Sequence, residues 1–188
     1  MTRREVIKSI YSVAPEQPII FSTGYTCREA FDIEDRRSNF YMVGSMGLAA
    51  SIGIGIAVNC REKSVIVIDG DGSFLMCPNN IFIAGELRLK NLIHIVIDNQ
   101  MYESTGRQKT YSGNLDFSSM ALNAGYNLCK KIDNIEEFNE SFASAIHSKK
   151  GPAFFHVVVD ATNTQISKRV SVPLVQLKNR MSDFLQAK

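Results

Sequence analysis

The sequence predicts an α/β fold in which a doubly wound, mostly parallel sheet of about five or six strands carries helices on both faces. Two apolar, β-branched runs, 64–68 and 92–97, have the composition of strands that are buried on both sides. A segment of helical length, 79–90, separates them, with Pro78 at a first-turn position. Strand, helix and strand in this order form a βαβ unit, whose parallel strands end at the same edge of the sheet.

Polar residues follow both of these strands. A Gly-Asp-Gly-Ser turn at 70–73 follows the first strand, and Asp98-Asn99 follows the second. Open α/β sheets bind ligands at this edge. The carboxylate of Asp71 and the amide oxygen of Asn99 suit Mg²⁺, which takes one or two protein carboxylates and completes its shell with phosphate and water. The glycines beside Asp71 let main-chain N–H groups approach a phosphate closely. The sequence therefore predicts a metal–diphosphate site.

The rest of the chain adds elements on either side of this unit. The segment 48–59 is an apolar helix containing two glycines, and we expect it to pack against the sheet or against a partner subunit. Thr26 is a candidate helix cap, and the segment 100–114 is a long loop of the kind that is usually functional or disordered. Residues 1–188 are expected to form one domain that ends in a crossing and a terminal helix over 161–188. Further helices are predicted over 3–13, 26–33, 116–124, 135–149 and 173–187, and further strands over 18–22, 39–43, 127–132 and 153–159.

Composition excludes several classes of function. The net charge is +2, and no basic run interleaves with aromatic residues, so nucleic-acid binding is not expected. No apolar run reaches the roughly 20 residues that span a membrane. The four cysteines show no Cys-x-x-Cys spacing, which is typical of free thiols in a cytoplasmic protein. His94 and His156 lie inside apolar strands and are expected to be hydrogen-bonded core residues.

The turn at 70–73 together with Asn99 resembles the diphosphate-binding motif of thiamine-diphosphate enzymes. The resemblance implies that Mg²⁺ is held by Asp71, Asn99 and the main-chain carbonyl of Met101. It also implies that thiamine diphosphate contacts the turn and the residues near its two ends. The cofactor-binding residues implied in this way are Gly44, Ser45, Met46, Gly70, Asp71, Gly72, Ser73, Asn99, Met101 and Tyr102.

Upstream, the segment 40–53 resembles the part of these enzymes that faces the thiamine pyrimidine ring. By this likeness the Gly44 carbonyl accepts a hydrogen bond from the 4′-amino group, and Met46 holds the cofactor in its bent shape, so both are implied catalytic residues. The segments 22–29, 44–47 and 103–108 resemble phosphonopyruvate and sulfopyruvate decarboxylases, and the likeness spans roughly residues 5–186. The implied reaction releases CO₂ from a small 2-oxo acid and leaves the corresponding aldehyde.

The oxyanion end of such a substrate would bind polar residues of the segments 22–29 and 103–108, because an arginine fork suits phosphonate and sulfonate groups. The candidates are Arg28, Ser104, Thr105 and Arg107, and Tyr25 and Tyr102 are candidates for lining the cavity. These residues do not distinguish a substrate that carries a phosphonate group from one that carries a sulfonate group. A decarboxylase or synthase for another 2-oxo acid, of the acetolactate synthase type, stays open, as does a non-catalytic scaffold that binds the cofactor or a nucleotide.

Members of this family activate the cofactor with a glutamate on a pyrimidine-binding domain, and no segment of this chain resembles that domain. Either a separate α-type subunit carries the glutamate, or the chain is a fragment of a longer enzyme. The initiating Met1 and the helix that follows favour a separate subunit. We therefore expect a homo- or hetero-oligomer whose active site forms at a subunit interface.

Overall fold

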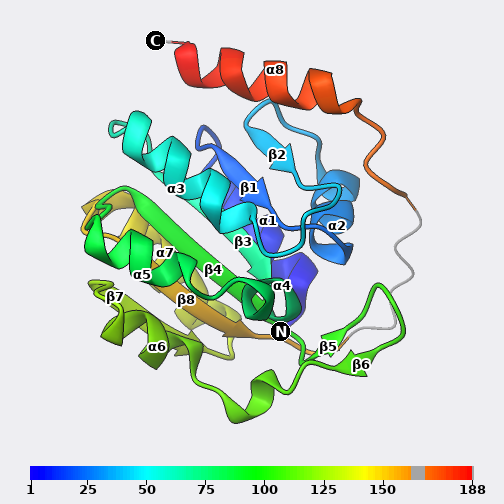
Figure 1. The fold of residues 1–188 in the computed structure, drawn as a ribbon, viewed down its shortest axis with the longest axis vertical. Helices are drawn as coiled ribbons and strands as arrows, with labels where there is room; N and C mark the ends of the chain where they lie inside the picture. The colour runs from blue at the N-terminus through cyan, green and yellow to red at the C-terminus, as the bar shows by residue number, and fades with distance from the viewer. Residues whose placement is uncertain (162–167, 188) are drawn as a thin grey trace.

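The structure, a computed structural model, describes residues 1–161 and 168–187. Its centre is a six-stranded parallel sheet with the strand order β2-β1-β3-β4-β8-β7, which confirms the predicted class of fold (Figure 1). A short antiparallel hairpin of β5 and β6 follows β4. The strands of the main sheet are β1 (Ile19–Phe21), β2 (Asn39–Tyr41), β3 (Val65–Gly70), β4 (Leu92–Asp98), β7 (Leu128–Ile132) and β8 (Ala153–Val158), and those of the hairpin are β5 (Met101–Tyr102) and β6 (Gln108–Lys109).

Helices cover both faces of the sheet and bury a separate apolar core on each (Figure 1). Alternate residues of the central strands face opposite cores, so Val65 and Val67 pack on one side and Ile66 on the other. This two-sided burial is why the central strands are mostly apolar. One layer contains α1 (Arg3–Val13), α2 (Tyr25–Ile33), α7 (Ile135–Ser148) and α8 (Leu174–Gln186), and the other contains α3 (Ala49–Asn59), α4 (Asp71–Met76), α5 (Asn80–Glu86) and α6 (Phe117–Asn123).

Side chains that accept from free main-chain N–H groups fix several helix starts. Thr2 and Glu5 form a capping box at α1, and Asp116 and Asn134 cap α6 and α7. The predicted cap at Thr26 is wrong: α2 starts at Tyr25 after Gly24, whose φ of 99° is a conformation that glycine adopts at low cost.

The helix predicted over 79–90 is shorter than expected. It is α5 (Asn80–Glu86), and a separate six-residue helix, α4 (Asp71–Met76), starts directly at the predicted diphosphate turn. Pro78 lies between the two helices and disfavours a helical conformation for the residue before it, which accounts for the break. Asp71 therefore stands in the first turn of a helix.

The segment predicted as a long loop, 100–114, contains ordered structure. The hairpin of β5 and β6 occupies its first part, and a 3₁₀ turn (Ser112–Asn114) closes it. Its low apolar content concealed the hairpin, because strands of two residues leave no alternating pattern to recognise.

The C-terminal part agrees with the sequence where the structure describes it. The helix α8 lies against the edge strand β2 at one side of the sheet (Figure 1). Most of the predicted crossing at 161–169 lies outside the described residues. Among the helices of the described ranges, none combines the length and apolar content that a membrane crossing needs.

Candidate active site

The two predicted metal ligands leave neighbouring strands at the same edge of the sheet. β3 ends at Gly70, β4 ends at Asp98, and the register pairs Gly70 with Ile97. Asp71 and Asn99 therefore follow the carboxyl ends of adjacent parallel strands, where open sheets bind ligands. Both side chains are buried and line one small pocket of about 50 Å³. The predicted meeting of these two residues is confirmed.

The Asp71 carboxylate is held from the segment after the hairpin. Its Oδ2 accepts hydrogen bonds from the hydroxyl groups of Thr110 at 2.5 Å and Ser112 at 3.4 Å. Burial raises the pKa of Asp71 to about 6, although the Thr110 hydrogen bond opposes the rise and nearby Asp98 adds to it. A buried carboxylate in such a setting gains from binding a cation, because the cation offsets the cost of keeping the charge out of water.

Asn99 is held at both ends of its amide. Its Nδ2 donates to the Glu103 carboxylate at 3.0 Å, and its Oδ1 accepts from the Met101 N–H at 3.2 Å. The Met101 carbonyl accepts from the Glu103 N–H at 3.0 Å. Each of these oxygens has a second lone pair, so both retain the capacity to bind a metal ion.

The pocket is narrow above Gly72. A Cβ atom built on this glycine would stand 2.3 Å from a ring carbon of Tyr102 and 3.1 Å from the methyl group of Met46. The two side chains therefore converge over bare backbone, and a larger residue at position 72 would collide with them. Gly70, Ser73 and Met101 complete the predicted cofactor-binding residues that line the pocket.

Ser73 already uses its hydroxyl within the chain. It donates to Asp69 Oδ1 at 2.7 Å and accepts from the Gly47 N–H at 3.1 Å. The contact joins α4 to the loop before α3 and so positions Met46 beside the pocket. Ser73 also lines the pocket, so its predicted role in holding a diphosphate remains a proposal.

The remaining predicted residues are divided between the lining of the pocket and the surface around it. Gly44 and Ser45 are exposed in the loop after β2. Of the substrate candidates Ser104 lines the pocket, and so do both cavity candidates, Tyr25 and Tyr102. Arg28 stacks over the Tyr25 ring, with 5.5 Å from its guanidinium carbon to the ring centre. Two further candidates are exposed on the hairpin: Thr105, which donates to the Tyr102 carbonyl, and Arg107.

Two buried aspartate–histidine pairs support the strand ends. Asp69 contacts His94 at 3.0 Å, and Asp98 contacts His156 at 2.8 Å. Burial alone would raise the pKa of Asp98, but hydrogen bonds from His156 and Ser112 hold it below its usual value. Both histidines are hydrogen-bonded core residues, as predicted.

The supporting residues of the site were missed from the sequence. The contact between Thr110 and Asp71 joins residues 39 apart, and the contact between Arg3 and Glu103 joins residues 100 apart. No short motif reports pairs at such separations. The available signal was the length and polar composition of the segment 100–114, which is typical of a functional loop.

The chemistry of the pocket fits Mg²⁺ with a diphosphate. Within the described ranges no cluster of three or more His, Cys, Asp or Glu residues is arranged to hold a metal ion. The Asp71 carboxylate, the Asn99 amide oxygen and the Met101 carbonyl are instead available at the pocket, which the Glu103 carboxylate also lines while accepting from Arg3 and Asn99. This is the incomplete oxygen set that Mg²⁺ uses when phosphate and water supply its remaining ligands.

The parallel sheet and this oxygen-lined pocket at its carboxyl edge define a cofactor-binding α/β domain of the kind found in thiamine-dependent enzymes. A family model for the thiamine pyrophosphate enzyme, C-terminal TPP binding domain, matches residues 23–157. The chain belongs to this family.

Individual relatives include two kinds of decarboxylase. The chain is 39% identical to sulfopyruvate decarboxylase subunit beta of Methanocaldococcus jannaschii, over 98% of this chain and 97% of the relative. It is 30% identical to phosphonopyruvate decarboxylase of Streptomyces viridochromogenes, over 98% of this chain and 46% of the relative. The chain therefore spans nearly the whole length of the first relative and about half of the second.

A solved structure supports the fold. Benzoylformate decarboxylase from Polynucleobacter necessarius superposes with a TM-score of 0.69 at 16% sequence identity. The match covers 86% of this chain and 34% of that enzyme. At this identity the likeness concerns the fold alone.

Proposed function

We propose that this chain is the diphosphate- and Mg²⁺-binding subunit of a thiamine-diphosphate-dependent decarboxylase acting on 3-sulfopyruvate or 3-phosphonopyruvate. The observation that carries the proposal is the placement of Asp71 and Asn99 in one buried pocket at the carboxyl edge of the sheet. Relatives named for these two activities support the choice of substrate, since both substrates are 2-oxo acids with a tetrahedral oxyanion group.

The residues of the chain would bind and orient the cofactor. Asp71, Asn99 and the Met101 carbonyl would hold Mg²⁺ against the diphosphate, and Gly72 would leave room for the phosphate oxygens. Met46 and Tyr102 would bound the cavity and exclude water from it. The bound cofactor supplies the electron sink that 2-oxo acid decarboxylation requires.

A partner subunit or domain that carries an activating glutamate completes the proposal. Large apolar side chains are exposed on α3, on α4, on and directly after α5, and on the loop that leads into α3. A partner that covered these side chains would bury apolar area at the same time as it closed the pocket. They are Val43, Met46, Leu48, Val58, Met76, Phe82, Ile83 and Leu87.

The substrate end of the site is only partly present in this chain. Ser104 lines the pocket, whereas Arg28, Thr105 and Arg107 lie outside its lining. We infer that closure over the pocket brings one of these arginines to the sulfonate or phosphonate group, because an arginine fork matches such oxyanions.

The four free cysteines support a cytoplasmic location for the complex, where thiols stay reduced.

Calorimetric titration of the full chain with thiamine diphosphate tests the proposal. We predict affinity that requires Mg²⁺ and that Asp71→Ala lowers by at least about tenfold, which is ~1.4 kcal/mol. Asp116→Ala is the matched control, because this aspartate caps α6 away from the pocket. Equal affinity with and without Mg²⁺, or tighter binding of a nucleotide, would count against the proposal and favour a scaffold that binds a different ligand.

A further inference from the structure

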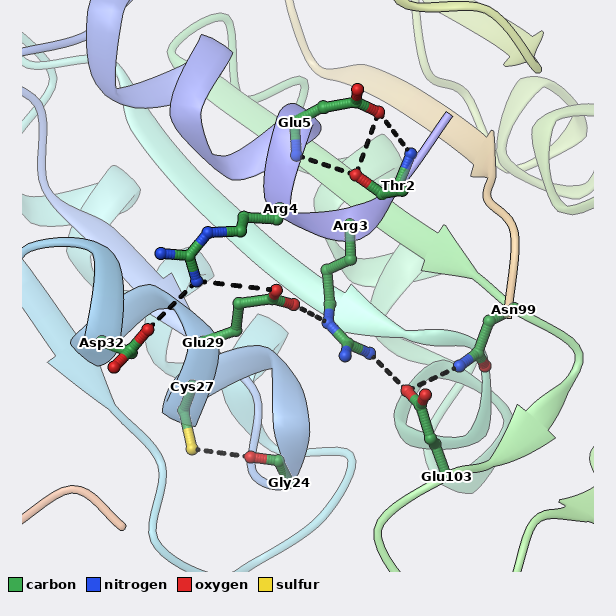
Figure 2. A network of polar contacts seen from close by, with 10 residues as sticks. All are labelled: Thr2, Arg3, Arg4, Glu5, Gly24, Cys27, Glu29, Asp32, Asn99 and Glu103. Carbon is green, nitrogen blue, oxygen red and sulfur yellow. Dashed lines mark hydrogen bonds and ion pairs between the residues drawn. The ribbon is translucent and has the colours of Figure 1, made fainter. Parts of the chain in front are cut away.

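A buried ion network connects the N-terminal helix to the pocket. The Arg3 guanidinium lies between two carboxylates, with its Nε 2.6 Å from Glu29 Oε2 and its Nη1 2.8 Å from Glu103 Oε2 (Figure 2). The three side chains are 8%, 4% and 6% exposed. They come from α1, α2 and the segment after β5, so the network joins three elements that are distant in sequence.

The two carboxylates differ in one respect. Glu29 contacts Arg3 and reaches Arg4 at 4.0 Å, and it has no contact with the pocket ligands in the network drawn (Figure 2). Glu103 Oε2 accepts from Arg3 and also from Asn99 Nδ2 at 3.0 Å. Glu103 thus links the buried guanidinium to the amide that stands at the end of β4.

The contact fixes which way the amide faces. An asparagine amide has an oxygen at one position and an NH₂ group of nearly the same shape at the other. A carboxylate accepts hydrogen bonds only, so Glu103 selects the orientation that places Nδ2 toward itself. Asn99 Oδ1 then faces away from Glu103, where it accepts from the Met101 N–H. In the opposite orientation, NH₂ protons would occupy the place of a metal-binding oxygen.

We propose that Glu103, held by Arg3, is a positioning residue that keeps the oxygen of the Asn99 amide directed to the metal ion. The inference rests on the proposed function, since it takes Asn99 as a Mg²⁺ ligand. Partners that orient metal ligands through hydrogen bonds commonly change metal affinity by about 10- to 100-fold when removed.

The hydrogen bonds of the network leave one buried carboxylate oxygen unpaired within the described part of the chain. The second oxygen of Glu103, Oε1, is buried among the described residues without a hydrogen-bond partner. An unsatisfied buried carboxylate oxygen is unfavourable, and apolar replacements of buried ion pairs are often neutral or stabilising. Packing alone does not favour a buried carboxylate here, whereas the orientation of the Asn99 amide requires a hydrogen-bond acceptor at this place.

The pair of glutamates provides a matched experiment. Thiamine diphosphate is titrated into the full chain at a series of Mg²⁺ concentrations, and the Mg²⁺ concentration for half-maximal binding is compared between variants. Glu103→Met is expected to raise this concentration by about 10- to 100-fold. Glu29→Met removes the other carboxylate of the same guanidinium and is expected to leave it unchanged. Glu103→Gln, which keeps an oxygen facing Asn99, is expected to restore most of the affinity.

A reciprocal change keeps the proposal testable if Glu103→Met does not fold. Asn99→Asp offers the metal a full carboxylate but opposes it to the Glu103 carboxylate, so we expect weaker Mg²⁺ binding. Adding Glu103→Gln supplies an NH₂ donor to the new aspartate and should recover the affinity. Such a rescue is expected from an orienting contact and not from a structural one.

The outcomes separate this proposal from the one on which it rests. If wild-type chain binds thiamine diphosphate with a Mg²⁺ requirement, but Glu103→Met and Glu29→Met shift the Mg²⁺ midpoint equally or not at all, the positioning role is overturned and the proposed function stands. If wild-type chain shows no Mg²⁺-dependent binding, both are overturned.

Discussion

Buried polar residues at the strand ends are the most informative single residues of this protein. Asp69, Asp71, Asp98 and Asn99 are each no more than 9% exposed. Polar groups buried to this degree must be hydrogen-bonded or bind a ligand. Asp69 and Asp98 meet this need with histidines, whereas Asp71 is supported by neutral hydroxyl groups. This contrast distinguishes the carboxylate that can take a cation from those that hold the fold.

Position 72 requires a residue without a side chain. Gly72→Ala should lower the affinity for thiamine diphosphate by about tenfold or more, ~1.4 kcal/mol, because the new methyl group would stand 2.3 Å from the Tyr102 ring and displace it. Calorimetric titration measures the effect. Gly55→Ala is the control, since nothing lies within 4 Å of a Cβ there. Unchanged affinity in Gly72→Ala would mean that the cofactor does not approach this backbone.

The meeting of Asp71 and Asn99, the proposed metal ligands, was predictable from the sequence, but the residues that hold their side chains were not. Asp71 and Asn99 each follow an apolar strand run, and the order of elements places two such ends together. The orienting contacts of Thr110 and Glu103 depend on how the hairpin folds back over the sheet. Strands of two residues carry no periodic signal, so that fold could not be read from spacing.

At the scale of elements, the helix α3 contains two glycines whose surroundings differ. A Cβ at Gly53 would stand 2.1 Å from a methyl group of Val67 on β3, so close packing within the chain requires this glycine. At Gly55 nothing lies within 4 Å. The sequence left open whether the helix packs on the sheet or on a partner. Gly53 shows that the helix packs on the sheet, and the open space at Gly55 leaves room for a partner.

This difference gives an opposite pair of effects on stability. Gly53→Ala should lower the free energy of unfolding by about 1–3 kcal/mol through overpacking against β3. Gly55→Ala should raise it by about 1 kcal/mol, because alanine favours the helix and meets no neighbour. Urea denaturation of the isolated chain measures both. If Gly55→Ala also weakens association with the partner subunit, α3 belongs to the interface, and unchanged association would exclude it.

Element limits followed the sequence where the pattern was long and failed where it was short. The main strands lie within two residues of their predicted limits, and the central strands β3 and β4 are long, mostly apolar runs that are buried on both sides. The helix α4 was missed, since the glycines at 70 and 72 are typical of a turn. The sequence predicts Pro78 in the first turn of a helix, whereas it lies between α4 and α5.

At the scale of the whole molecule, the pocket lies at one edge of the sheet and the exposed apolar side chains on the neighbouring helices and loop. Val43, Leu48, Met76 and Phe82 are each more than 40% exposed. A partner that covered these side chains would remove their apolar area from water. The arrangement agrees with a chain whose site is completed from outside.

Reconstitution tests this arrangement. The purified chain with Mg²⁺, thiamine diphosphate and 3-sulfopyruvate or 3-phosphonopyruvate should release no CO₂ above background. Adding a subunit that carries the activating glutamate should produce turnover, because the chain supplies the diphosphate site and the partner the cofactor activation. Assay of CO₂ release measures the effect, and full turnover by the chain alone would contradict the need for a partner.

The position of the bound metal tests the central claim most directly. Crystals grown with thiamine diphosphate and Mn²⁺ in place of Mg²⁺ would locate the ion by its anomalous scattering. We predict one peak in contact with the Asp71 carboxylate, the Asn99 amide oxygen and the Met101 carbonyl, with diphosphate oxygens completing the shell. A metal ion bound elsewhere, with the Asp71 carboxylate still facing Thr110 and Ser112 alone, would contradict the account.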